Sequence, residues 1–154
     1  MGRWGAVLGL TAAAVLSYAC APPAPEGLDT TALDREIGQR IGDPSTCVLV
    51  AQQASGQIVY RYGLSTACER ALPTCQGAST ETLQDLLGRL ETPAVPIATS
   101  CPTTSDGSRS VGWSAGAVDG HDLVYAAVME GERALPGRVM ADRLAGAFTA
   151  AGLD

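Results

Sequence analysis

The sequence predicts an α+β domain in which helices pack on a single antiparallel sheet of four to five strands. Two pairs of β-rich segments, within 46–63 and 109–130, are each joined by a short turn, which is the pattern of antiparallel hairpins. Three segments with apolar residues at helical spacing precede, separate and follow these pairs. The expected order is therefore α-β-β-α-β-β-α.

The first helix is expected over residues 29–41, with Asp29 or Thr30 as its N-cap. Its apolar residues recur at four-residue steps: Leu33, Ile37 and Ile41. This spacing forms a narrow apolar stripe, and the segment 42–44 (Gly-Asp-Pro) is expected to end the helix.

The first hairpin is expected to pair strands 46–53 and 57–63 around the turn 54–56. Residues 64–78, which contain two cysteines, are expected to form a loop. A middle helix is expected over 79–91, with Ser79 or Thr80 as N-cap. Its leucines have the spacing of one helical face: Leu83, Leu86, Leu87 and Leu90.

The second hairpin is expected to join strands 109–118 and 122–130 at Asp119-Gly120, after a short strand near 97–100. One face of the strand 109–118 carries Val111, Trp113 and Ala115. The opposite face carries Gly112, Ser114 and Gly116, which leaves room for a helix or a ligand to approach closely. The last helix follows Pro136 and ends at Gly152, and its inward residues are Met140, Leu144, Phe148 and Ala151.

The composition excludes several classes of chemistry. All 10 basic residues are arginines, against 16 acidic residues, and no cluster of positive charge suggests a nucleic-acid partner. Without lysine the chain has no Ser-Lys dyad, Schiff base or Walker lysine. His121 is the single imidazole, so we expect no metal or other cofactor.

The N-terminal segment predicts export and lipidation. Residues 1–19 have a short positive region followed by an apolar stretch, as in signal peptides. Cys20 follows this stretch and resembles the acylated cysteine of bacterial lipoproteins, which implies a membrane anchor at the periplasm or cell surface. Residues 20–28 then form a Pro-rich spacer before a domain at 29–154. Cleavage to a secreted protein and an uncleaved membrane anchor are the alternatives.

The remaining cysteines predict two disulfides, because four cysteines follow Cys20 in an exported chain. They are Cys47, Cys68, Cys75 and Cys101. Among the three possible connectivities, we favour Cys68–Cys75, which closes a short loop, together with Cys47–Cys101.

Several segments together resemble the penicillin-recognising serine hydrolases, which include β-lactamases and penicillin-binding proteins. The hairpin sequence ASGQIVYRYG, the segment RALPTCQGAST and the C-terminal part that begins SVGWSAGAVDG carry the resemblance. It implies a related helix-and-sheet domain in which Ser79 takes the place of the nucleophile. Thr82 then stands where the family has its lysine, and CPTTSDGSRS replaces the Lys-Thr-Gly strand.

These departures favour a non-catalytic binding domain whose partner is an envelope protein or a cell-wall component. Residual acylation at Ser79 is the enzymatic alternative. The element order also resembles small profilin-like or roadblock-like modules, which implies an assembly role as a third possibility.

Other chemistry-bearing residues have structural interpretations. We expect His121, Asp119 and Asp122 to be turn residues and Trp113 to be a core residue. Tyr60 and Tyr62 share one face of their strand and are expected to pack under a helix. Glu130 and Glu132 flank Gly131 and are expected to keep the strand end soluble.

Overall fold

The computed structural model of the chain describes residues 27–153. The predicted signal peptide 1–19, the predicted lipidation of Cys20 and most of the spacer 20–28 lie outside the described residues. None of the helices within the described range has the length and apolarity of a membrane-spanning segment.

The described chain has an α+β fold, which confirms the predicted class. Its helices are α1 (Thr30–Ile41), α2 (Ser65–Cys68), α3 (Leu83–Gly88) and α4 (Gly137–Ala150). Its strands are β1 (Thr46–Gln52), β2 (Ile58–Tyr62), β3 (Leu72–Pro73), β4 (Thr80–Glu81), β5 (Ile97–Pro102), β6 (Ser110–Val118) and β7 (Leu123–Gly131). Five of the strands form an antiparallel sheet in the order β2-β1-β7-β6-β5, and β3 pairs with β4 in a separate two-stranded ribbon.

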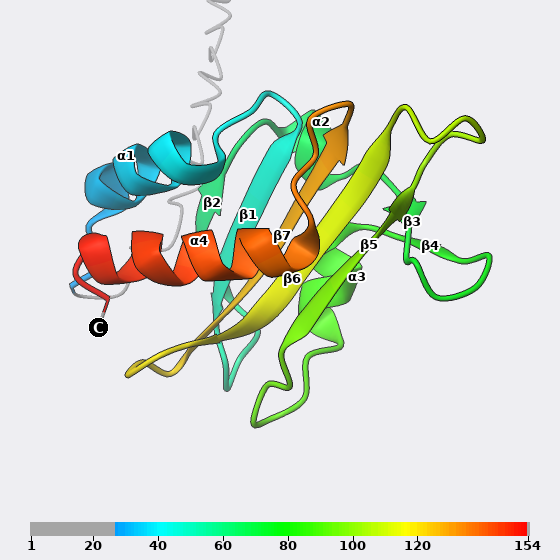
Figure 1. Cartoon of the computed structure of the whole chain (residues 1–154). Coiled ribbons are helices and arrows are strands. Elements are labelled where there is room, and N and C mark those ends of the chain that lie inside the picture. Colours follow the sequence, from blue (N-terminus) through cyan, green and yellow to red (C-terminus); the bar gives the residue numbers. More distant parts are fainter. Residues whose placement is uncertain (1–26, 154) are drawn as a thin grey trace, which may run out of the picture.

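The sheet is covered on both faces. Figure 1 shows α1 and α4 lying across one face, here called the helical face. The other face, here called the disulfide face, is covered by α2, α3 and the β3–β4 ribbon. Side chains alternate between the two cores along each strand. In β1, for example, Val48 and Val50 enter the core of the helical face, whereas Cys47 and Leu49 enter the other.

The two long helices agree with the periodicity of their sequences. The Asp29 side chain caps α1 by accepting a hydrogen bond from the Ala32 amide at 2.9 Å. The apolar stripe of α1 is buried, as predicted: Leu33, Ile37 and Ile41. In α4 the predicted residues Met140, Leu144 and Phe148 are buried, and Ala151 just beyond the helix is half-buried. Gly152 follows with φ +87°, the left-handed conformation that glycine adopts most easily.

Gly112 of β6 allows α4 and the segment before it to lie close to the sheet, as its position predicts. A side chain at Gly112 would collide with the carbonyl oxygen of Leu135, in the segment that leads into α4. The Ser100 hydroxyl of β5 accepts a hydrogen bond from the Gly137 amide at 2.8 Å. This bond satisfies an amide at the start of α4 that has no partner within the helix.

The disulfide pairing differs from the predicted one. Cys47 is bonded to Cys68, and Cys75 is bonded to Cys101, so the expected Cys68–Cys75 and Cys47–Cys101 pairs are wrong. The expected loop 64–78 contains α2, which places Cys68 against β1, with 5.2 Å between the Cα atoms of Cys47 and Cys68. The β3–β4 ribbon then carries Cys75 to the edge strand β5.

Truncation of a buried α4 side chain should destabilise the fold far more than truncation of an exposed one. Leu144 is fully buried in the core of the helical face, so Leu144→Ala should lower the free energy of unfolding by about 2–5 kcal/mol. Leu64 is 62% exposed, and Leu64→Ala should change it by less than about 0.5 kcal/mol. Urea denaturation with intact disulfides measures the free energy of unfolding of both variants. Equal decreases in the two variants would contradict this packing of α4.

Candidate functional site

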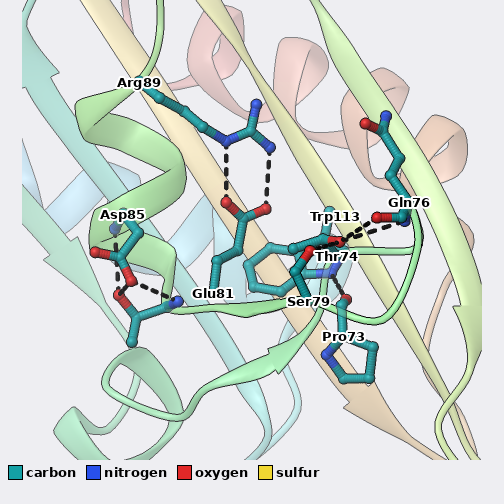
Figure 2. Close-up of polar contacts among 9 residues, drawn as sticks. Pro73, Thr74, Gln76, Ser79, Glu81, Asp85, Arg89 and Trp113 are labelled. Atoms are coloured by element: carbon teal, nitrogen blue, oxygen red, sulfur yellow. Dashed lines mark hydrogen bonds and ion pairs between the residues drawn. The ribbon is translucent and has the colours of Figure 1, made fainter.

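Ser79, the one residue that the sequence suggests as a nucleophile, lies exposed at the end of the loop between β3 and β4. Its hydroxyl oxygen is 2.9 Å from that of Thr74, and its carbonyl oxygen accepts a bond from the Thr74 amide at 3.1 Å. Figure 2 shows this pair beside Gln76, whose carbonyl oxygen accepts a bond from the Thr74 hydroxyl. Among the described residues, the side-chain partner of Ser79 is therefore another hydroxyl and not a base.

The expectation that Ser79 or Thr80 caps the middle helix is wrong, because α3 begins later than predicted. Thr80 and Glu81 pair with Pro73 and Leu72 in the ribbon, so the chain is extended at the expected helix start. Thr82 is the N-cap, and its hydroxyl accepts a bond from the Asp85 amide at 3.2 Å. The Asp85 carboxylate accepts bonds in return from the Thr82 amide and hydroxyl, which lower its pKa.

The carboxylate that follows Ser79 in the chain also has a structural partner. Glu81 accepts two hydrogen bonds from the Arg89 guanidinium, from Nε at 2.9 Å and from Nη2 at 3.0 Å. In Figure 2 the Glu81 carboxylate is directed toward Arg89. A bidentate pair of this kind fixes the carboxylate in one orientation. The polar side chains around the start of α3 thus serve the local structure.

The aromatic candidates are core residues, as predicted. Trp113 is buried in the disulfide face, and its indole N–H donates to the Pro73 carbonyl oxygen at 2.7 Å. Tyr60 is buried under α1 and donates to Asp34 at 2.8 Å. Burial and the Asp34 carboxylate raise the pKa of Tyr60. Tyr62 lies under the same helix, with its hydroxyl beside Gly38.

The polar residues of the second hairpin turn lie at the surface. His121, Asp119 and Asp122 are exposed, in agreement with their interpretation as turn residues. No group of three or more metal-ligating side chains occurs within residues 27–153.

Glu130 differs from its predicted role as a solubilising residue, because its side chain is only 3% exposed. Oε1 accepts bonds from Thr103 Oγ1 at 2.9 Å and Arg109 Nε at 3.0 Å. Oε2 accepts bonds from Arg70 Nη1 at 2.8 Å and Arg109 Nη2 at 2.9 Å. The expectation for Glu130 is therefore wrong, while Glu132 is exposed as expected.

The environment of Glu130 keeps its carboxyl group ionised. Hydrogen bonds from Arg109 lower its pKa below the ordinary value of 4.5, against the opposing effect of burial. The bond from Thr103 and the charge of Arg70 act in the same direction as Arg109. An ionised carboxylate in this position joins β7 to the chain after α2 and to the link between β5 and β6.

A cavity of about 530 Å³, here called the Glu130 pocket, opens beside this cluster. The residues that line it include Asp43, Ser45, Arg70, Arg109, Glu130, Gly131, Glu132 and Arg133. The buried carboxylate of Glu130 lines this cavity together with several exposed charged side chains. Sequence reasoning missed it because the segments that build it are far apart in the chain.

Comparison with known proteins identifies no relative of this chain. No protein-family model, no curated protein and no solved structure matches it.

Removal of the Glu130 charge should weaken the fold in a pH-dependent way. Glu130→Gln replaces an ionised acceptor of four hydrogen bonds and should lower the free energy of unfolding at neutral pH by about 1.5–3 kcal/mol. The exposed neighbour provides a control, and Glu132→Gln should change it by less than about 0.5 kcal/mol.

The pH dependence follows from the direction of the pKa shift. Because the folded pKa of Glu130 lies below 4.5, its ionised form stabilises the folded chain above that pH. The difference between wild type and Glu130→Gln should therefore be constant near neutrality and shrink as the pH falls below 4.5. Denaturant titrations at several pH values measure this difference in the free energy of unfolding. A difference that grows on acidification would contradict the lowered pKa of Glu130.

Proposed function

We propose that the chain is an extracytoplasmic lipoprotein that is anchored to a membrane through Cys20 and that binds an envelope component without catalysis. The two disulfides indicate an oxidising, extracytoplasmic setting. They join four of the five cysteines to each other, so Cys20 is the one left for lipidation. This count and the signal-like segment before Cys20 support the anchor.

One observation carries the non-catalytic part of the proposal, namely the surroundings of Ser79. A serine hydroxyl needs a nearby base to become a nucleophile. The Ser79 hydroxyl pairs instead with the hydroxyl of Thr74 on an exposed loop. The sequence has no lysine, and the exposed His121 belongs to the turn between β6 and β7.

The resemblance to penicillin-recognising hydrolases suggests what kind of binding domain this is. The order of α1, the β1–β2 hairpin, the β6–β7 hairpin and α4 is compatible with that resemblance. Thr82, at the position of the lysine, uses its hydroxyl to cap α3. We therefore propose a pseudoenzyme that keeps a fold of that type and uses it for binding.

A fluorescent penicillin tests the absence of catalysis. The purified chain should form no covalent adduct, because no described side chain is placed to take the Ser79 proton. Denaturing gel electrophoresis with fluorescence detection reports the adduct, and an active penicillin-binding protein serves as the positive control. A stable adduct that is lost in Ser79→Ala would overturn the proposal.

The intact mass of the membrane-extracted chain tests the anchor. The expected mass corresponds to cleavage before Cys20, addition of a diacylglycerol to its sulfur and loss of four hydrogens in two disulfides. Cys20→Ser should abolish the lipid mass and release the protein from the membrane fraction. An unmodified Cys20 in the membrane-extracted protein would contradict the lipoprotein assignment.

A further inference from the structure

The Glu130 pocket brings together chain segments that are distant in sequence. Ser45 precedes β1, Arg70 lies between α2 and β3, and Arg109 lies directly before β6. Gly131 and Arg133 come from the end of β7 and the residues after it. Three of the ten arginines of the chain therefore line one cavity, although the whole chain has a net charge of −6.

Two of the carboxylates that line the pocket, the buried Glu130 and the half-buried Asp43, use most of their hydrogen-bond acceptor sites within the protein. Glu130 accepts four bonds, which is about the full capacity of a carboxylate. Asp43 accepts bonds from the Ser45 amide and hydroxyl at 3.1 and 2.8 Å, and from Arg133 at 3.0 Å. These carboxylates thus have little capacity left for a ligand.

The donors of the pocket are in surplus. A guanidinium has five N–H groups. Among the described side chains, one N–H group of Arg70 and two N–H groups of Arg109 donate to Glu130. One N–H group of Arg133 donates to Asp43. The unused groups of these three side chains favour a ligand that presents acceptors, and the buried Glu130 carboxylate holds Arg70 and Arg109 in place for it.

The pocket leaves space for such a group at Gly131. At Gly131 a side-chain carbon would lie 3.8 Å from Arg109 Nη2 and 3.9 Å from the Ser45 hydroxyl oxygen. Because glycine has no side chain, this space is open. A ligand oxygen above Gly131 would therefore lie beside a guanidinium that has a fixed orientation.

We propose that the Glu130 pocket binds a carboxylate-bearing ligand of small-peptide size. The inference rests on the proposed binding function and gives it a ligand class. The planar guanidinium matches a carboxylate bidentately. Three arginines and three acidic residues line the pocket, so its charge is balanced, which favours a monoanionic carboxylate over a multiply charged phosphate. The exposed carboxylate of Glu132, which also lines the pocket, can pair with a ligand amino group.

A titration with matched ligands tests the proposal. The probes are glycylglycine, its C-terminal amide and inorganic phosphate, added to the isotope-labelled full chain in detergent micelles. Glycylglycine should give saturable NMR shifts at the amides of Ser45, Gly131 and Ala134. The amide, which lacks the carboxylate, should bind at least about tenfold more weakly, and phosphate should also bind more weakly.

Substitution of the arginines connects the shifts to the pocket. Arg70→Gln should weaken glycylglycine binding by about tenfold or more, since the ligand carboxylate loses a hydrogen bond from the charged guanidinium. Arg133 is 84% exposed, so Arg133→Gln leaves the fold intact and should weaken binding in the same direction. Arg61, which is exposed and lies outside the pocket, provides the control, and Arg61→Gln should bind as wild type does.

Each outcome decides the inference. Equal binding of the acid and the amide, shifts that do not saturate, or wild-type binding by both pocket variants would overturn it. Tighter binding of phosphate than of glycylglycine would replace the carboxylate by another anion and so overturn the ligand class. A failure here, with Cys20 acylated and no penicillin adduct, leaves the proposed function standing with a different ligand.

Discussion

The burial of the sheet on both faces is the constraint on which the structure depends. Every residue from 123 to 130 in β7 is buried, since the strand lies between β1 and β6 and under a core on each side. A polar side chain in such a strand must find partners inside the protein. Glu130 is that case, and its four hydrogen bonds join the chain after α2 and the link between β5 and β6 to the end of β7. One buried charge thus organises the loops at this end of the sheet.

The two faces of the sheet are stabilised in different ways. The helices of the helical face, α1 and α4, have 12 and 14 residues and bury continuous apolar stripes. The disulfide face is covered by α2 and α3, of four and six residues, and by the two-residue strands of the ribbon. Such short segments gain little stability from their own hydrogen bonds. Both disulfides and the bond from the Trp113 indole to Pro73 attach α2 and the ribbon to the sheet.

The sequence predicts the fold where the signal is local. Periodic apolar residues give α1 and α4, and turn residues give both hairpins, with boundaries within one or two residues of those observed. Four-residue helices and two-residue strands are too short to show a period, so the sequence does not predict the elements between Gly63 and Thr82. The pairing of Cys75 with Cys101 depends on where these short elements place the chain. The burial of Glu130 depends on its neighbouring strands and likewise gives no local signal in the sequence.

The polar side chains around Ser79 form a network that stabilises the local structure. In the proposed relation to penicillin-recognising hydrolases, Thr82 stands at the position of the essential lysine. Its hydroxyl caps α3 together with Asp85, and the preceding Glu81 is held by Arg89. A lysine at this position would remove a cap worth about 1 kcal/mol at the start of a six-residue helix. The side chains that follow Ser79 thus stabilise the local fold, and a lysine at position 82 would act against that stability.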